Sequence, residues 1–282
     1  MKRVVFLAAL LAAATAMGQD WEGDLQDETE SEVAPLHAMV GVTWDSKYIW
    51  RGFDIYDDKS VTHMMVDLNL FETGFGVSAV GHRANSSGFE DQERWDGTAY
   101  YQSGLWAGEP YAMNFRVGFV HYLFPELNEG ESLDMQEGQL VLAWPNILPI
   151  QGLQPSYALI KMWPADSGSR LPDAASGWMH IVMLDYGFSV PAIFPNMSDQ
   201  VITLHSELVY NDGLAVTPRF WNPDNDWTHA VFGASTDFVF GEANNIVLTP
   251  AVYYQITMES SISEDGDADN ELWVSLGLKC SF

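Results

Sequence analysis

The 282-residue chain has few cations and almost no cysteine. Lysine and arginine number 12 against 39 aspartates and glutamates, which gives a formal net charge of −27. So acidic a chain should not bind nucleic acid or anionic headgroups by electrostatic attraction, and we expect no nucleic-acid partner. The single cysteine, Cys280, excludes a disulfide framework. After residue 18 no apolar run reaches the roughly eighteen residues of a transmembrane helix.

The N-terminal segment has the order of a secretory signal. Residues 1–18 read MKRVVFLAALLAAATAMG, with Lys2 and Arg3 before an apolar stretch that ends in small residues. Removal of these two cations would change the net charge from −27 to −29. Residues 19–35 are acidic and nearly free of apolar residues, which predicts a disordered lead segment. The remainder, residues 36–282, is uniform and is predicted to form one domain.

In that domain apolar and polar residues alternate with a period of two. The clearest case is residues 271–282, ELWVSLGLKCSF, in which Val274, Leu276 and Leu278 share one face with the terminal Phe282. Hydrophobic residues make up 47% of the chain and aromatic residues 13%, so an exported β-protein or an outer-membrane barrel is indicated. The predicted strands are 36–51, 61–71, 75–84, 97–106, 111–123, 136–144, 152–163, 177–189, 201–210, 227–240, 245–258 and 271–282.

The connections between the predicted strands alternate in length. Those after even-numbered strands are mostly short, such as ETG at 72–74, and those after odd-numbered strands are mostly long and acidic, such as ESSISEDGDADN at 259–270. Short periplasmic turns and long extracellular loops are typical of transmembrane barrels. We therefore predict an all-β fold, an antiparallel barrel of about twelve strands in the bacterial outer membrane. A secreted β-sandwich is the rival fold, but soluble chains rarely end in an alternating strand closed by phenylalanine.

Residues 45–53, DSKYIWRGF, place two cations and three aromatic residues at the end of the first predicted strand. By parity Tyr48 and Trp50 should face lipid, and Lys47 and Arg51 should face inward. The inward cations would then pair with the acidic loops at the mouth of the barrel, or form a ligand site.

This stretch resembles the start of the TorF-type porin family (the Gcw_chp group), whose members open with a Ser-Asp-Tyr-x-x-Arg-Gly-like motif. Ser46, Tyr48, Arg51 and Gly52 match, and Lys47 stands in the acidic position. The similarity extends loosely over most of the predicted barrel. The resemblance implies an outer-membrane β-barrel that acts as a pore, and it indicates location and fold more than substrate.

Inward parity predicts a lumen lined by polar side chains, because ionisable groups inside a membrane-spanning element face a wet cavity or one another. Side chains fill barrels of about eight strands, and barrels of about sixteen leave wide channels, so twelve strands predict a narrow, partly obstructed lumen. The predicted pore-lining residues are Lys47, Arg51, His63, Asp67, Asn69, His82, Arg116, Glu137, Gln139, Asp185, His205, Glu207, His229, Asp237, Gln255 and Lys279. The predicted membrane-interface aromatics are Tyr48, Trp50, Trp144, Trp163 and Phe282.

One acidic segment has a spacing similar to that of a calcium loop. Asp265, Asp267 and Asp269 alternate as calcium ligands do, but Asn270 stands where the loop needs glycine and Leu276 where it needs glutamate. At most a weak divalent-ion site is expected there, and no cofactor and no other metal site is predicted.

An outer-membrane lipid hydrolase would need a serine beside a histidine at the lipid boundary. His205 and Ser206 are neighbours in a predicted strand and so point to opposite faces, and His82 has inward parity. We therefore expect no enzyme, but a porin-like channel for passive diffusion of small hydrophilic solutes with a preference for cations. A lipid-hydrolysing enzyme and a closed structural or adhesive barrel are the alternatives. The expected partners are outer-membrane lipid, small solutes and the barrel assembly machinery, which would read the C-terminal strand.

Overall fold

The computed structural model describes residues 36–127, 132–165, 176–192, 199–214, 225–240, 245–258 and 270–282. The predicted signal peptide, the acidic lead segment, and Asp265, Asp267 and Asp269 lie outside these residues. Within them the only helical element is a short 3-10 turn, η1 (Glu90–Gln92). No helix of this part of the chain is long and apolar enough to cross a membrane.

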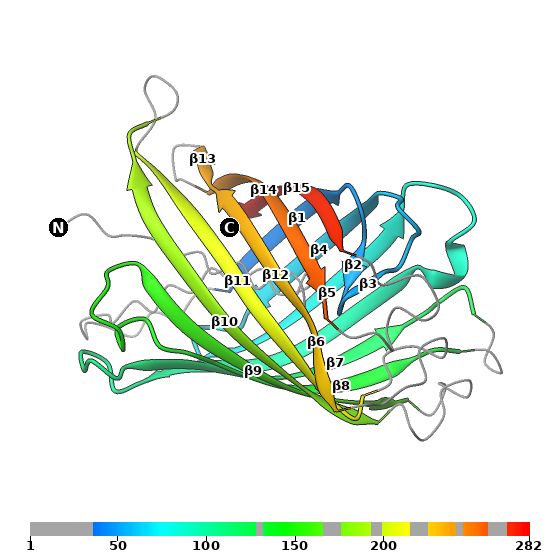
Figure 1. Ribbon diagram of the computed structural model, residues 1–282, viewed down its shortest axis with the longest axis horizontal. Helices are drawn as coiled ribbons and strands as arrows, with labels where there is room; N and C mark the ends of the chain where they lie inside the picture. The colour runs from blue at the N-terminus through cyan, green and yellow to red at the C-terminus, as the bar shows by residue number, and fades with distance from the viewer. Residues whose placement is uncertain are drawn as a thin grey trace.

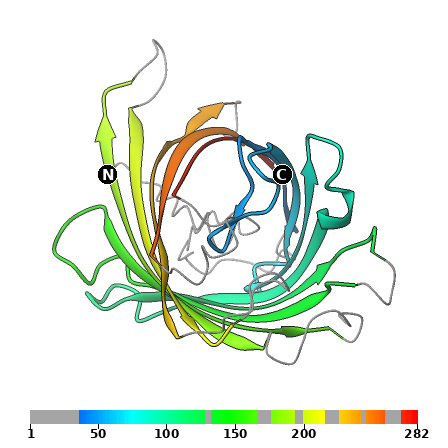
Figure 2. The same cartoon turned by 45° about the vertical axis from the view of Figure 1, so that its right-hand side comes forward.

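Twelve antiparallel strands close into a barrel (Figures 1 and 2). Each wall strand pairs with the next along the chain, and β1 (His37–Asp45) pairs with β15 (Glu271–Ser281), which joins the first strand to the last. The strands β12 and β13 are consecutive parts of one wall strand interrupted at Asp237, and both pair with β14. The other wall strands are β4 (Val61–Asn69), β5 (Phe75–Ala84), β6 (Arg94–Leu105), β7 (Met113–Leu123), β8 (Met135–Ala143), β9 (Leu153–Pro164), β10 (Gly177–Val190), β11 (Gln200–Asp212), β12 (Asp226–Thr236), β13 (Phe238–Phe240) and β14 (Ile246–Thr257). The predicted all-β barrel of about twelve strands is confirmed.

The two ends of the barrel are distinguished by their connections. The start of β1, the end of β15 and the connections 70–74, 106–112 and 144–152 lie at one end, the turn end. The connections 46–60 and 85–93 lie at the other, the loop end, as do residues 124–127 and 132–134.

The two faces of the wall have opposite character. In β15, Leu272, Val274, Leu276 and Leu278 point outward and are between 44% and 60% exposed, whereas Trp273 is buried inside. The same alternation exposes large apolar side chains on other strands, among them Val42, Val66, Val77, Val117, Val182, Leu204, Phe232 and Val252. An apolar face that runs around the barrel would be unfavourable in water and is favourable in hydrocarbon.

The predicted first strand, 36–51, is too long. β1 ends at Asp45, and the last backbone–backbone hydrogen bond of this segment to a wall strand is that of the Ser46 N–H, which donates to the carbonyl of Val274 at 2.9 Å. The chain then turns into the barrel and forms a hairpin of β2 (Ile49–Trp50) and β3 (Phe53–Asp54). Figure 2 shows this hairpin, in blue, inside the ring of strands. We refer to residues 46–60 as the inward hairpin.

The predicted lipid-facing position of Tyr48 and Trp50 is therefore wrong. These side chains are 1% and 4% exposed and lie in the core inside the barrel, together with Tyr122 and Met179. Side-chain parity holds only along a continuous strand, and the strand ends three residues before Tyr48.

Candidate functional site

A two-residue turn at Arg51 and Gly52 forms the tip of the inward hairpin. Their φ angles are 53° and 93°, and two positive values are typical of the tight turn that joins antiparallel strands. Glycine is needed here for a second reason, because a Cβ at this position would lie 2.8 Å from Nδ1 of His229 on β12. Nε2 of Gln255 on β14 donates to the Gly52 carbonyl at 2.9 Å. The tip is thus seated against one side of the barrel wall.

From this tip the Arg51 side chain reaches the wall across the barrel from β1. Its guanidinium donates to Glu137 on β8 and lies 3.1 Å from Sδ of Met179 on β10. The side chains of Arg51 and Glu137 are both fully buried. Tyr122 donates to Glu137 at 2.7 Å, and Gln139 donates to its other oxygen. A buried charge pair whose carboxylate accepts these further hydrogen bonds is strongly favoured over either charge alone.

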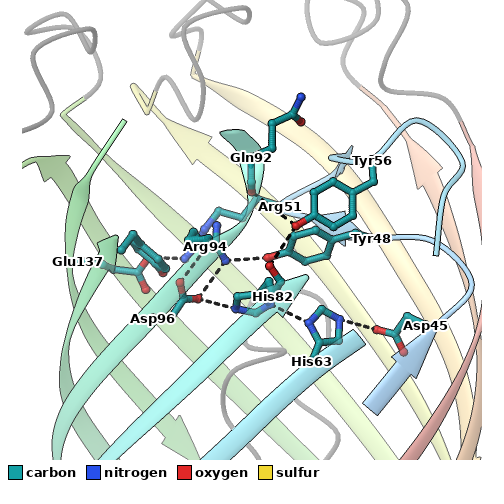
Figure 3. Close-up of polar contacts among 11 residues, drawn as sticks. Asp45, Tyr48, Arg51, Tyr56, His63, His82, Gln92, Arg94, Asp96 and Glu137 are labelled. Atoms are coloured by element: carbon teal, nitrogen blue, oxygen red, sulfur yellow. Dashed lines mark hydrogen bonds and ion pairs between the residues drawn. The ribbon is translucent and has the colours of Figure 1, made fainter. Parts of the chain in front are cut away.

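A second buried arginine holds the base of the hairpin (Figure 3). Arg94 on β6 donates to both carboxylate oxygens of Asp96, at 2.7 and 3.0 Å, and to the hydroxyl of Tyr48 at 2.8 Å. Its guanidinium also lies 4.4 Å from the ring centroid of Trp50 and 4.7 Å from that of Tyr122. Stacked cation–aromatic contacts of this kind stabilise a desolvated guanidinium.

Two histidines continue this network along the wall. Nδ1 of His63 lies 2.7 Å from Nδ1 of His82, and their Nε2 atoms contact Asp45 at 3.1 Å and Asp96 at 2.9 Å (Figure 3). An ionised carboxylate only accepts hydrogen bonds, so Nε2 of each imidazole is the atom that would donate to its aspartate. The ring of Tyr48 stacks on His82 at 5.2 Å between centroids.

Lys47 ties the hairpin to the last strand. Its ammonium lies 2.5 Å from Glu271 of β15 and also bonds Asp58 at the far side of the hairpin. Burial opposes the charge of Lys47, but its bonds to Asp58 and Glu271 outweigh this and raise its pKa. The hydrogen bond from Lys47 and the positive charge of Lys47 lower the pKa of Asp58. The contact between Lys47 and Asp58 therefore weakens only as the pH falls below the ordinary aspartate value of 3.8. The carboxylates of Asp58 and Glu271, together with that of Asp54, could hold a metal ion. In this structure the ammonium of Lys47 bonds two of these carboxylates, those of Asp58 and Glu271.

Most of the residues predicted to line a pore face the interior. Asp67, nearer the turn end, accepts a hydrogen bond from Tyr100 at 2.8 Å, and the guanidinium of Arg116 lies 3.7 Å from the ring centroid of Tyr100. The structure buries Arg51, His63, His82, Arg116, Glu137, Gln139, Asp185, His205, Glu207, His229 and Gln255 inside the barrel, and leaves Lys47, Asp67, Asn69, Asp237 and Lys279 half-buried on the same face.

The sequence reasoning missed Arg94 and Asp96, which hold the hairpin. The predicted strand began at residue 97, whereas β6 begins at Arg94. The alternation of polar Arg94, Asp96 and Thr98 with Trp95 and Gly97 continues the pattern of the strand and could have extended it.

The other three predicted interface aromatics lie outside the lumen or at its end. Trp163 on β9 packs against the exposed Phe119 and donates to Gln136 at 2.8 Å. Phe282 is 71% exposed at the turn end, where Trp144 follows β8 and is half-buried. Their contact with a membrane interface stays a prediction.

The candidate serine and histidine residues do not come together. His205 is buried inside the barrel, whereas Ser206 has the opposite parity on β11, is half-buried and donates to the carbonyl of Leu184. His82 is also inside, bonded to His63 and Asp96. These residues do not form a nucleophile and base on the outer surface of the barrel.

The barrel has the fold of solved outer-membrane porins. The NanC porin aligns with a TM-score of 0.52 at 12% identity, over 86% of this chain and 98% of that chain. The KdgM porin gives 0.48 at 12% identity, over 86% and 99%. OprD from Pseudomonas aeruginosa gives 0.38 at 9% identity, over 81% and 61%. No family model and no curated protein matches the sequence.

Proposed function

We propose that the protein is a porin-like channel of the bacterial outer membrane that passes small hydrophilic solutes by diffusion. The observation that supports this is the contrast between the faces of the closed barrel, apolar around the outside and charged within. The resemblance of residues 45–53 to the TorF-type family agrees with it. Outer-membrane lipid would cover the outer face, and solutes would pass beside the inward hairpin.

Location is tested by fractionation. We expect the protein in the outer-membrane fraction, with faster gel migration before heating than after, because a closed barrel stays compact until its strands are melted. Recovery of the protein in the soluble exported fraction would refute the membrane assignment.

Deletion of Phe282 should lower the yield of assembled barrel. Its N–H donates to the Ala38 carbonyl at 2.8 Å and its own carbonyl accepts from the N–H of Ala38 at 3.2 Å, so it completes the junction of the first and last strands. We also propose that the assembly machinery reads this strand. Pulse labelling, followed by the change in gel migration on heating (the heat-shift assay), measures the yield of assembled barrel. The control is Phe282→Tyr, which keeps the backbone and an aromatic ring. A deletion variant that assembles normally would show that the junction does not depend on this residue.

We further propose that the channel prefers cations, because inward carboxylates outnumber inward cations. Arg51, Arg94 and Lys47 are each already paired with a carboxylate. The inward carboxylates of the wall are Asp45, Asp67, Asp96, Glu137, Asp185, Glu207, Asp237 and Glu271, and the inward cations of wall and hairpin are Lys47, Arg51, Arg94, Arg116 and Lys279. A lumen with surplus negative charge raises the local concentration of counter-ions.

Reversal potentials in planar bilayers, with a chelator present, test this preference. Joint substitution Asp67→Asn and Glu207→Gln should reduce cation preference even at high salt, because confined charges are poorly screened. The matched control, neutralisation of Asp265, Asp267 and Asp269, should act mainly at low salt, because the sequence predicts a solvated loop there and the charges of such a loop are screened over about 8 Å at physiological ionic strength. Anion preference of the unaltered protein would contradict the proposal and point to Arg51, Arg94 and Arg116.

A closed structural barrel is the second candidate, and the inward hairpin is the observation that favours it. Arg51 and Arg94 together tie it to β6, β8 and β10. Conductance decides between the two, because a closed barrel inserts into a bilayer without producing current steps.

A further inference from the structure

Arg116 on β7 differs from the other two arginines that are buried inside the described part of the barrel. Arg51 pairs with Glu137 and Arg94 pairs with Asp96. Arg116 is only 3% exposed, yet within the described residues no carboxylate oxygen lies within 4.0 Å of its guanidinium. A buried charge without a countercharge is strongly unfavourable, so an unpaired guanidinium in the interior indicates that an anion binds there.

The guanidinium of Arg116 rests on a fixed support, the ring of Tyr100 on the neighbouring β6. Its central carbon lies 3.7 Å from the ring centroid, which is a contact distance for stacked groups. The ring packs directly against Gly76 on β5, where an added Cβ would lie 2.1 Å from Cζ of Tyr100. The hydroxyl of Tyr100 donates to Asp67 on β4 at 2.8 Å. Contacts with three strands therefore hold the ring and set the plane of the guanidinium.

The nitrogen atoms of this guanidinium lack acceptors. Nε of Arg116 is enclosed and has no hydrogen-bond partner in the described part of the chain. The two Nη atoms also make no hydrogen bond with a described residue, but they are not among the enclosed atoms, so they reach accessible space inside the barrel. A guanidinium carries five N–H donors, and buried donors rarely remain without an acceptor. The missing acceptor and the missing countercharge can be supplied by the same anion.

Arg116 lies apart from the residues that hold the inward hairpin. It is the fourth residue of β7, which begins with Met113 at the turn end. Tyr122, which donates to Glu137 in the hairpin network, is six residues further along the strand, or about 20 Å of extended chain. An anion bound to Arg116 would therefore leave the bonds of the hairpin unchanged.

The surroundings of Arg116 favour a planar anion with a single charge. A guanidinium donates two parallel N–H bonds to a carboxylate, and stacking on Tyr100 covers a face of the group but leaves its edges available. Asp67 lies at the far end of the Tyr100 ring, and inward carboxylates outnumber inward cations in the described wall. A second negative charge, as on phosphate, would be repelled by these groups.

We propose that Arg116, supported by Tyr100, is a binding site for a carboxylate group in the half of the lumen near the turn end. The carboxylate has two possible sources, a small organic solute and residues 19–35 of the chain, which carry seven acidic side chains and precede β1 in sequence. For the free solute the inference rests on the proposed function, because the solute would reach Arg116 through the channel. A carboxylate bound there neutralises one inward cation and so leaves the proposed cation preference of the lumen intact.

Binding is measured without current, so that its failure is distinct from failure of the proposed channel. The full chain, folded in detergent, is titrated with isotope-labelled acetate at constant ionic strength, and the width of the acetate NMR signal reports exchange with the bound state. We expect saturable broadening with acetate and none with acetamide, a neutral molecule of nearly the same shape. Equal broadening of both would overturn the proposal, because it would show that the charge of the carboxylate is not recognised.

Substitutions locate the binding at Arg116. Arg116→Met should weaken acetate binding more than about tenfold, because charge-assisted hydrogen bonds are lost, and Tyr100→Leu should weaken it severalfold. The heat-shift assay shows that each variant is folded. Arg116→Lys replaces the methionine variant if that does not fold, and it should weaken binding severalfold because an ammonium lacks two parallel donors. Arg83→Met, which removes an exposed arginine, is the control and should leave the affinity unchanged. Binding that survives the loss of the Arg116 guanidinium would refute the site.

A variant with the seven carboxylates of residues 19–35 neutralised distinguishes the two sources. Saturable acetate binding by the unaltered chain supports the site and identifies a free solute as the source. Binding that appears only in the neutralised variant, and is lost again with Arg116→Met, supports the site and identifies residues 19–35 as the source. Absence of saturable binding in both proteins would overturn the proposal and leave Arg116 as a cation stabilised by Tyr100 alone.

Discussion

Removing the inward hairpin should raise the single-channel conductance of the protein several-fold. Residues 48–56 carry the side chains that fill the lumen at the loop end, including Tyr48, Trp50 and Arg51, all almost fully buried. Replacing these nine residues by a short glycine–serine link would leave β1 and β4 adjacent, because their pairing from His37 to Val61 does not involve the hairpin. Recordings in planar bilayers at high salt measure the change.

The control for this experiment is Lys59→Ala. Lys59 is exposed and donates to the Asp57 carbonyl, so its removal should leave the conductance unchanged. Equal conductance of the shortened and unaltered proteins, with both folded by the heat-shift assay, would show that the hairpin does not limit the path. Measurable current only in the shortened variant would identify the unaltered protein as a closed barrel.

Substitution Arg51→Met should lower the free energy of unfolding by about 3–5 kcal/mol, because it leaves the buried carboxylate of Glu137 without its countercharge. Urea unfolding of the barrel in lipid vesicles, followed by tryptophan fluorescence, measures the loss. The hairpin should also become more mobile in the lumen, so noise in the open-channel current should rise with the same substitution.

A double-mutant cycle tests whether the loss comes from the pair. Arg51→Met combined with Glu137→Leu should cost less than the sum of the two single substitutions by about 1–3 kcal/mol. The surface pair of the exposed Arg83 and the half-buried Glu93, 3.5 Å apart, is the matched control, and its removal should cost less than about 1 kcal/mol. Additive effects of Arg51→Met and Glu137→Leu would contradict a coupled pair.

The sequence predicts the wall well because the wall obeys a simple rule. Each strand must present apolar side chains to one face and polar ones to the other, so alternation alone locates the strand and its inward residues, as for His205 and Glu207 on β11. All twelve predicted strands are present, most within a few residues of the predicted bounds.

The inward hairpin could not be predicted in the same way. Tyr48 and Trp50 continue the parity of Val42 and Trp44, and nothing in the local pattern marks the end of β1 at Asp45. Their position depends on contacts with residues far along the chain, such as Arg94 and Tyr122. The dipeptide Arg51–Gly52 was the available signal, since glycine at the second position suits a two-residue turn.

The enclosure of the hairpin constrains the order in which the chain assembles. Lys47 and Glu271 are 224 residues apart, Gly52 and Gln255 are 203 apart, and Arg51 and Met179 are 128 apart, so each contact waits for a much later strand. Contacts of such long sequence separation form late in folding because closing large loops costs entropy. A ring of paired strands has no side opening, so once β1 has met β15 residues 46–60 can enter or leave the interior only through the loop end. Pairing of those two strands therefore limits the hairpin to one route, and its contacts with β8, β10 and β14 then hold it inside.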